Sequence, residues 1–555
     1  MRHLLSLLLV PAFVVSHAQP FDWQWSRAGT GNLMEPLVVD MAVDADGNAY
    51  LVGNFYGTIT YGSLPSAIAV GQSDVFVVKY APDGTPLWLA QGGGSSWEEA
   101  TGIAVDTAGN AYITGSTSSP TADFGSTTLS LQGTMDVVVA KLNSSGQWQW
   151  AKHFGSNYTG DEAGQDIVAT ADGGTYITGA FKYYFELDAL PDLEGCSATQ
   201  DLFLLHLDTE GTPVWARNPD CTRDASYGLS TGQQLELDGQ GNLYLGARFR
   251  GDTCFFGNDT LPNAQTSGQT NDCLLAKYSL NGDLQWVRWI GGYGYDDVTD
   301  IAADAAGNCY VALKREDEYY LPEFQIPVSG SAGIYRAVLL NVSPTGEFLS
   351  WKRFGNSSYE HRVNRVHVDA ENDVLLTGWF EDRFEFDAVV FEGNGPYHGS
   401  FLARFANNGT VEEVFATRSN APRRFMAMDL DDADNLYLAG GFADTLTFPG
   451  TPTLDVVNTG AFLARSGDLT NGLAPVPLQE APRVFPSPSQ GTFAVRHTAP
   501  FGTVRIWNAT GALVVEERFA PTLVYELQGL EPGAYTVGIA MADGTTFRTP
   551  ALVVR

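Results

Sequence analysis

The sequence predicts an all-β protein: a seven-bladed β-propeller closed by an N-terminal strand, followed by a small immunoglobulin-like β-sandwich. Three observations support this fold class. An eight-residue pattern recurs seven times, a strand missing from the last repeat is found at the start of the chain, and the composition changes near the C-terminus. The 60 glycines and the low charged fraction of 17% also exclude a coiled coil or a long-helix protein.

The repeat is built on the octet VDADGNAY at residues 43–50. Apolar residues alternate on both sides of an Asp-Gly or Gly-Asn turn, which is the strongest short-range signal for a β-hairpin. A second hairpin follows each octet, so each repeat supplies four strands, as in a propeller blade. The other six octets, spaced by 62 to 68 residues, lie at 105–112, 169–176, 237–244, 303–310, 368–375 and 430–437.

The last repeat has no fourth strand after residues 461–466. Residues 21–27 (FDWQWSR) match residues 146–152 (GQWQWAK) of the second repeat almost position by position. We therefore expect the first strand of the chain to complete the last blade. Closure would leave no open sheet edge, and it argues against a solenoid, the alternative repeat architecture.

The combined pattern of an aromatic strand end, Gly-Gly and IAVDTAGNAYITG (residues 103–115) resembles the bacterial extracellular beta-propeller repeat proteins of the SBBP type. The resemblance covers about residues 20–466. It implies a propeller of an exported protein, with residues 19–466 as the propeller domain, and it leaves the ligand open.

Residues 1–18 have the features of a secretory signal peptide. Arg2 and His3 precede an apolar run at residues 4–15, and Ala18 is a small residue at the expected cleavage position. We expect cleavage after Ala18; a short membrane anchor is the alternative. The apolar run is too short to span a bilayer, so no transmembrane segment is expected in the mature chain.

A Pro-rich linker at residues 467–482 precedes strands with alternating apolar residues in the domain 483–555. This domain resembles the type A C-terminal sorting domain of the type IX secretion system of Bacteroidota. The resemblance implies the type IX secretion machinery as a partner and delivery through the periplasm to the outer cell surface or the medium. An ordinary accessory sandwich is the alternative. The positions that carry the resemblance are Phe485, Pro486, Pro488, Leu530, Gly533, Tyr535, Val537 and Ile539.

The net charge of −33 disfavours nucleic acid and anionic lipid as partners, because the protein's field repels phosphates. The loops that join successive blades should open on one rim, where aromatic residues accompany acids and later bases. Such side chains suit sugars, although the acids would equally satisfy turn amides. The candidate ligand-binding residues are Trp97, Glu98, Glu99, Asp161, Glu162, Tyr295, Asp296, Asp297, Tyr359, Glu360, Arg362 and Arg423.

Five cysteines in an exported chain permit disulfides. Numbering across the second hairpin of the third repeat predicts a Cys196–Cys221 bond. Cys254 and Cys273 flank an inserted loop and form the second predicted pair. Cys309 lies within a strand and is expected to be a buried thiol.

No cofactor, metal site or catalytic residue is predicted. The acids of residues 44–48 alternate as in a calcium loop, but the hairpin turn explains them better. The chain has none of the common hydrolase or phosphate-loop motifs. We therefore expect a non-catalytic binding or adhesion module for a glycan or a surface protein. The alternatives are a polysaccharide hydrolase or lyase on the propeller, and a structural surface protein without a specific ligand.

Overall fold

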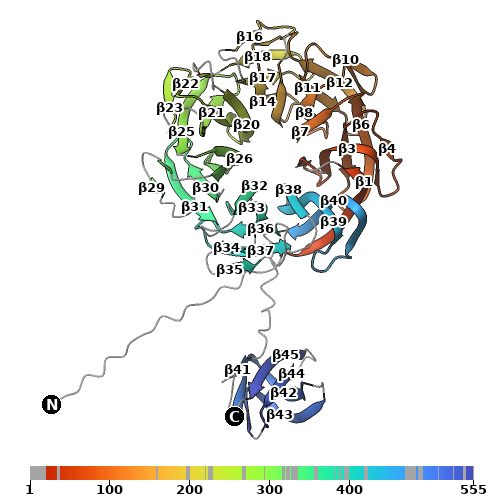
Figure 1. Ribbon diagram of the computed structural model, residues 1–555, viewed down its shortest axis with the longest axis vertical. Coiled ribbons are helices and arrows are strands. Elements are labelled where there is room, and N and C mark those ends of the chain that lie inside the picture. The colour runs from red at the N-terminus through yellow and green to blue at the C-terminus, as the bar shows by residue number, and fades with distance from the viewer. Residues whose placement is uncertain are drawn as a thin grey trace, which may run out of the picture. The chain divides into compact units, whose positions relative to one another are not determined.

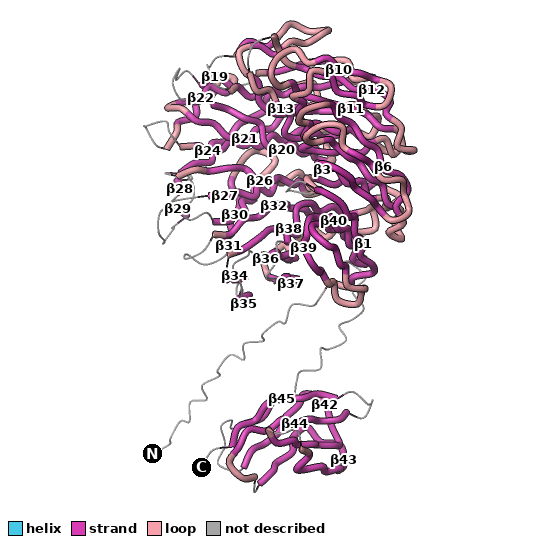
Figure 2. The backbone as a smooth tube through the Cα atoms, turned by 45° about the vertical axis from the view of Figure 1, so that its right-hand side comes forward, coloured by secondary structure: helices cyan, strands magenta, loops and turns pink. Residues whose placement is uncertain are grey.

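The computed structural model forms two compact units, residues 1–470 and 471–555. Its described secondary structure is entirely β (Figure 2), and no helix in that part of the chain is long and apolar enough to cross a membrane. The structure describes residues 21–33, 38–157, 160–195, 200–218, 220–222, 229–264, 270–292, 294–315, 319–320, 325–326, 336–354, 360–381, 383–386, 389–392, 399–417, 423–468, 483–485, 492–509, 512–528, 530–541 and 546–553.

In the first unit each repeat contributes an antiparallel set of strands, and the sets follow one another around a common axis (Figure 1), as is typical of a β-propeller. The sets of the first four repeats are β2 (Asp40–Val43), β3 (Ala49–Tyr61), β5 (Asp74–Tyr80) and β6 (Pro86–Gly94); β7 (Glu98–Val105), β8 (Ala111–Thr117), β11 (Asp136–Leu142) and β12 (Trp148–Phe154); β13 (Ala163–Ala169), β14 (Thr175–Phe181), β17 (Asp201–Leu207) and β18 (Pro213–Arg217); and β20 (Leu229–Asp238), β21 (Asn242–Arg250), β24 (Asn271–Ser279) and β25 (Leu284–Gly292).

The later repeats follow the same order, with the first strand of each set innermost. These inner strands contact one another in the order β2, β7, β13, β20, β26, β32 and β38, and β38 contacts β2. The sets are β26 (Asp296–Ala303), β27 (Cys309–Arg315), β30 (Arg336–Val342) and β31 (Phe348–Phe354); β32 (His361–Val368), β33 (Val374–Phe380), β36 (Gly399–Phe405) and β37 (Val411–Thr417); and β38 (Arg423–Leu430), β39 (Asn435–Leu446) and β40 (Leu454–Asp468).

Strand β1 (Trp23–Leu33) connects the two ends of this arrangement. Its residues from Trp23 to Gly31 pair with β40, and its end pairs with β3 of the first repeat. The first and last sets thereby join into one 11-stranded sheet. Strand β40 runs two residues beyond the predicted domain end at Ser466.

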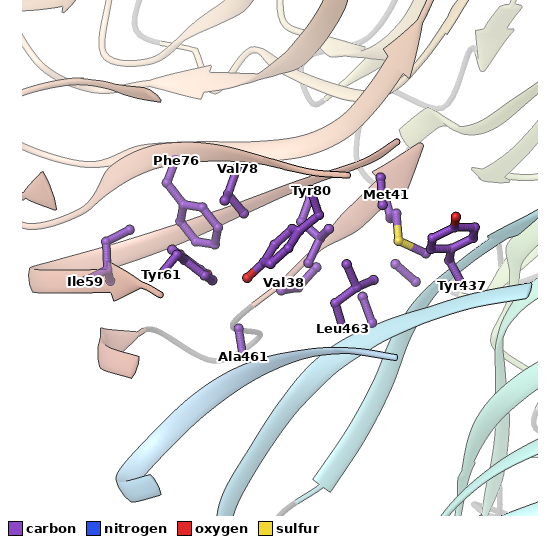
Figure 3. Packing of buried hydrophobic residues seen from close by; sticks show 14 of the residues in the cluster. Val38, Met41, Ile59, Tyr61, Phe76, Val78, Tyr80, Tyr437, Ala461 and Leu463 are labelled. Carbon is purple, nitrogen blue, oxygen red and sulfur yellow. The ribbon is translucent and has the colours of Figure 1, made fainter. Parts of the chain in front are cut away.

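Hydrophobic clusters lie between consecutive repeats. One of them is shared by the first repeat, with Tyr61 and Phe76, and the last, with Tyr437 and Leu463 (Figure 3). A second cluster packs Trp23 of β1 against Phe448 and residues of the sixth and seventh repeats. The chain ends are therefore held by the same kind of apolar contact that holds neighbouring repeats.

Tryptophans of several fourth strands bond to the next repeat. The Trp88 indole N–H donates to the Ser144 carbonyl at 3.0 Å, in the hairpin turn of the following repeat. Trp25 of β1 makes the equivalent bond to the Pro82 carbonyl of the first repeat at 2.9 Å. The recurring aromatic strand ends thus have a structural role that the sequence pattern alone did not explain.

The octet forms the predicted turn between the first two strands. One Asp44 oxygen accepts the backbone N–H groups of Asp46 and Asn48, and Gly47 supplies the positive φ of 76°. The two octets without a glycine place Asn372 and Asp434 at this position, with φ of 62° and 55°. Asn and Asp are the non-glycine residues that tolerate this conformation best.

Short strands extend the sets outward. Two of these strands end in an aromatic residue at a hairpin turn, Phe124 and Phe256, each followed by a glycine with positive φ. Their hairpins also reach back, since β9 pairs with β6 of the preceding repeat. The short strands are β4 (Ala67–Ile68), β9 (Thr121–Phe124), β10 (Thr127–Ser130), β15 (Tyr184–Phe185), β16 (Leu193–Glu194), β19 (Asp220–Thr222), β22 (Thr253–Phe256), β23 (Asp259–Pro262), β28 (Tyr319–Tyr320), β29 (Gln325–Ile326), β34 (Arg383–Phe386) and β35 (Val389–Glu392).

The second unit is a five-stranded antiparallel sheet, in which hydrogen bonds connect all strands. Its longest strand, β42, shifts register between Arg496 and Phe501, so one strand serves two differently paired segments. Val504, Ile506 and Val537 are fully buried in this unit. The strands are β41 (Arg483–Phe485), β42 (Thr492–Asn508), β43 (Leu513–Gln528), β44 (Gly533–Met541) and β45 (Thr546–Val553).

Candidate functional site

The inner strands of successive repeats begin on one face of the first unit, called here the strand-start face. Two predicted aromatics are exposed there, Trp97 at 39% and Tyr295 at 38%. The Trp97 backbone is fixed, because its N–H and carbonyl both bond to Ser118 while the ring remains exposed. The Arg250 guanidinium lies 5.7 Å from the Tyr295 ring centre.

Three predicted rim acids are not at the surface. The Glu98 carboxylate is fully buried and accepts hydrogen bonds from the Gly94 N–H at 2.6 Å and the Thr117 hydroxyl at 2.8 Å. Glu162 and Asp296 are equally buried, and burial together with Asp136 raises the pKa of Glu162 to about 8.

Glu98 holds the start of its strand through these bonds, and all three acids are buried instead of exposed on the rim. The physical reason is the two-residue alternation of a strand, which turns Glu98 inward and its neighbour Glu99 outward. Asp161 is exposed as predicted for a rim residue.

A group of half-buried charges lies on the same face, called here the basic cluster: Arg248, Lys314 and Arg362 with Asp297 and Glu360. Arg248 and Asp297 form an ion pair at 2.7 Å, and Asp297 stands opposite Lys314 in the β26–β27 ladder. Burial and the Arg362 charge lower the pKa of Lys314. Burial, Arg365 and Arg424 lower the pKa of Arg362, against the opposing pull of the two acids. Cations therefore outnumber acids locally in a protein that is strongly acidic overall.

Two guanidinium groups of this cluster retain unused donors. The Nε atoms of Arg248 and Arg362 are buried without a hydrogen-bond partner among the described residues. The sequence indicated Arg362, Asp297 and Glu360, but it missed Arg248 and Lys314. Those two lie near the ends of second strands β21 and β27, which reach the same face because they run antiparallel to the inner strands.

Two predicted residues cannot be placed as ligand contacts. Tyr359 lies outside the described residues. Arg423 begins β38 opposite Phe442, and its side chain lies outside the description. Both remain predictions from the sequence.

Deeper along the axis, carboxylates of the inner strands bond to the next repeat. Asp40, Asp166 and Asp300 accept the backbone N–H groups of Ile103, Leu235 and Val366 at 2.7 to 3.0 Å.

Glu236 and Asp429 make the same kind of bond to Ala303 and Val43. Arg365 donates to the Val39 carbonyl and pairs with Asp40 at 3.0 Å. These five carboxylates of Asp40, Asp166, Glu236, Asp300 and Asp429 are called here the axial carboxylate ring. They were not predicted. The signal available in the sequence was an acid that recurs near the middle of several inner strands.

Asp44, the acid of the first octet, makes further contacts with side chains. Besides the turn amides, Asp44 accepts the Asn48 side-chain amide at 2.8 Å and pairs with Lys79 at 3.4 Å. This geometry agrees with the hairpin-turn interpretation of residues 44–48. Within the described part of the chain, no group of three His, Cys, Asp or Glu side chains is arranged to hold a metal ion.

The Cys254–Cys273 disulfide is not formed. Cys273 is a buried thiol that packs with Cys309 in the cluster between the fourth and fifth repeats. Cys254 packs in the cluster between the third and fourth repeats, on the other face of the same repeat. Cys196 and the side chain of Cys221 lie outside the described residues, so that bond remains a prediction, as does signal cleavage after Ala18.

A polar pocket of about 410 Å³ lies at the outer edge between the second and third repeats. Lys152 and His153 line it together with Glu186 and Asp192. The His153 Nδ1 lies 2.7 Å from the buried Asp136 carboxylate, which fixes the ring. This pocket is an alternative location for a ligand.

Comparison with protein families finds a match in each of the two units. Residues 92–121 match the SBBP family, described as a beta-propeller repeat. Residues 483–553 match the family described as a secretion system C-terminal sorting domain. No curated protein matches the chain. The sorting domain shows that the protein is secreted or lies at the outer cell surface.

Several solved structures are distantly similar. An ulvan lyase, a polysaccharide lyase, is 11% identical over 76% of this chain and 93% of that chain, with a TM-score of 0.38. A protein of unknown function from Dyadobacter fermentans is 10% identical over 80% and 100%, with a TM-score of 0.34. A gluconolactonase of Xanthomonas campestris is 11% identical over 81% and 99%, with a TM-score of 0.27. TM-scores this low say nothing about what this chain binds.

Proposed function

Because the chain carries a beta-propeller repeat and a secretion system C-terminal sorting domain, we propose that it is an exported, non-catalytic binding or adhesion protein. Its ligand, a glycan or another surface protein, is held at the strand-start face. The type IX secretion machinery delivers it from the periplasm by recognising residues 483–555. The signal peptide 1–18 and the linker 467–482 are part of the same proposal.

The proposed scaffold is a closed ring of seven blades over residues 19–466, with β1 as the fourth strand of the last blade. The register of β1 with β40 and the bond from Trp25 to Pro82 support this closure. A closed ring keeps the strand starts of distant repeats at fixed separations, so side chains from several repeats can contact one ligand.

The observation that carries the binding proposal is the convergence of repeats four to six at one place. Arg248, Asp297 and Arg362 come from three different repeats and form one half-buried cluster. Exposed Trp97 and Tyr295 lie on the same face and offer rings for stacking. In contrast, the fully buried Glu98, Glu162 and Asp296 cannot act on a bound chain, which weakens the alternative of a polysaccharide hydrolase or lyase.

A glycan array and a surface-protein panel probed with the mature protein test the proposal. The double variant Trp97→Ala, Tyr295→Ala should keep its melting temperature and lose about tenfold or more in affinity, since stacking contacts contribute roughly 1 kcal/mol each. Tyr184→Ala is the matched control, because Tyr184 is equally exposed, at 39%, on an inserted hairpin. Unchanged affinity in the folded double variant would place the ligand elsewhere.

The same samples separate the alternatives. Release of reducing sugar or of unsaturated ends from a bound polysaccharide would identify an enzyme. Absence of any ligand in both panels would favour a structural surface protein.

A further inference from the structure

We infer that the basic cluster recognises a single anionic substituent, a carboxylate or a sulfate, on an otherwise neutral extracellular glycan. This inference rests on the proposed binding function and names the chemical class of its ligand. It is carried by Arg248 and Arg362, whose Nε atoms are buried without a partner among the described residues. An oxyanion is the group that satisfies guanidinium N–H donors most strongly, through charge-assisted and often paired hydrogen bonds.

Electrostatics in the cluster favour an added negative charge. Arg248 donates from one terminal nitrogen to Asp297, and its Nε–H has no partner among the described residues. Arg362 is influenced by the negative charges of Asp297 and Glu360 and by the positive charges of Arg365 and Arg424.

Burial and the mutual repulsion of these cations depress the pKa values of Lys314 and Arg362, and one bound anion would relieve the repulsion. The cluster thus has the properties of an anion site whose own acids do not neutralise it.

The overall charge limits the kind of anion. A net charge of −33 repels a long polyanion, whereas a lone carboxylate or sulfate senses mainly the nearest groups. At physiological salt, charges beyond about 8 Å are largely screened. A glycan with sparse acidic groups therefore fits better than nucleic acid or a densely charged chain.

Exposed Tyr295 and Trp97 on the same face would contact the neutral sugar rings of such a ligand. The anionic group then fixes its position, while the rings supply apolar contact.

Binding of three probes to the full mature protein tests the inference: a sparsely sulfated galactan oligosaccharide, its desulfated form, and an oligosaccharide with one uronate per repeat. We expect the sulfated or the uronate probe to bind at least tenfold more tightly than the neutral one. Arg362→Gln and Arg248→Gln should each lose about tenfold in affinity for the acidic probe and leave the neutral probe unchanged. Arg362→Lys keeps the charge but not the Nε donor. It should fold and still lose most of the difference in affinity between the acidic and the neutral probe.

Lys152→Gln is the control, since it removes the same charge at the outer pocket. Its affinity for the acidic probe should remain within twofold of the unmodified protein. Loss of binding in Lys152→Gln alone would assign the anion to that pocket and overturn the inference.

Equal binding of acidic and neutral probes would overturn the inference while leaving the binding function standing. If no glycan probe binds but a surface protein does, the ligand class is wrong. If nothing in either panel binds, the proposed function fails as well.

An independent readout uses inorganic sulfate. At equal ionic strength, replacing chloride by sulfate should raise the melting temperature of the unmodified protein more than that of the Arg248→Gln, Arg362→Gln double variant, because a ligand stabilises the state that binds it. General salt effects on folding act on both proteins and cancel in this comparison. An identical sulfate shift in the two proteins contradicts an anion site at this cluster.

Discussion

The Asp429 carboxylate accepts a hydrogen bond from the backbone N–H of Val43 at 2.7 Å, although 386 residues separate the two. Asp429 belongs to the inner strand of the last repeat and Val43 to that of the first. The same kind of bond joins Asp300 of the fifth repeat to Val366 of the sixth, which are consecutive in the chain. The junction between the chain ends is therefore built like an interior junction, which has consequences for stability.

Deletion of residues 21–27 should lower the melting temperature sharply or cause aggregation. The deletion removes buried Trp23 and Trp25, and loss of one buried Trp costs about 3 kcal/mol or more. It also exposes β40 as an unpaired edge, a template for aggregation. Differential scanning calorimetry and light scattering of the mature protein measure the effect. A soluble truncation with an unchanged melting temperature contradicts closure by β1.

The single variant Trp25→Phe examines the closing contact alone. It keeps an aromatic ring but leaves the Pro82 carbonyl without its indole donor, at a cost of about 1 kcal/mol. Trp88→Phe removes the equivalent bond at an interior junction and should cost a similar amount. A negligible effect of Trp25→Phe beside a clear effect of Trp88→Phe would show that the chain ends are not held as interior repeats are.

The sequence reveals the repeat and the strand pairing because turn residues and period-two alternation are local signals. It also located the strand that pairs with β40, since residues 21–27 copy a fourth-strand pattern. It did not separate buried Glu98 from exposed Glu99, because the direction of the first residue of a strand depends on register.

The rest of the candidate site arises from tertiary placement. Arg248 meets Asp297 only because second strands end where inner strands begin, and nothing in the local sequence near Arg248 indicates this. Likewise, Cys254 and Cys273 are near in sequence but pack on opposite faces of one repeat. Sequence proximity was a poor guide to bonding there.

A pair of glycine variants separates backbone strain from crowding. Gly84 and Gly409 both have positive φ, 77° and 81°, in equivalent hairpin turns. A Cβ at Gly84 would lie 2.8 Å from the Trp25 ring, whereas at Gly409 nothing lies within 4 Å. Gly409→Ala should cost about 1–2 kcal/mol from strain alone, and Gly84→Ala clearly more. Chemical denaturation of both variants measures the difference; equal costs would mean that Trp25 does not pack on this turn.

Removal of residues 483–555 should leave the first unit folded and retained in the periplasm. The two compact units have separate buried cores, so the first should fold without the second. Fractionation of cells that produce the truncated protein would measure its distribution. Full surface or medium levels of a truncated chain would refute the role of the sorting domain in delivery.

Stability should decrease as the pH rises from about 4 to about 8, because of the axial carboxylate ring. Burial raises the pKa values of Asp166 and Glu236 to about 8 and those of Asp300 and Asp429 to about 7. The folded protein then binds more protons than the unfolded chain across this window, so the free energy of unfolding falls with increasing pH. The melting temperature should be higher at pH 5 than at pH 9.

Asp429→Asn tests the origin of this dependence. Asp429 accepts the N–H groups of Val43 and Leu430, and Asp40 and Asp431 add negative charge nearby, while His367 lies 3.7 Å away. Burial lowers the pKa of that histidine from 6.5 to about 4, so its own contribution has the opposite sign: between these pH values the unfolded chain binds the proton and stability rises with pH. The histidine is present in both proteins, so the comparison isolates Asp429. Because asparagine binds no proton, the variant should show a smaller fall in melting temperature between pH 5 and pH 9.

Asp46→Asn is the control, because Asp46 is an exposed acid in an octet turn, and it should leave the fall in melting temperature unchanged. Equal pH dependence in all three proteins would show that the ring does not take up protons on folding.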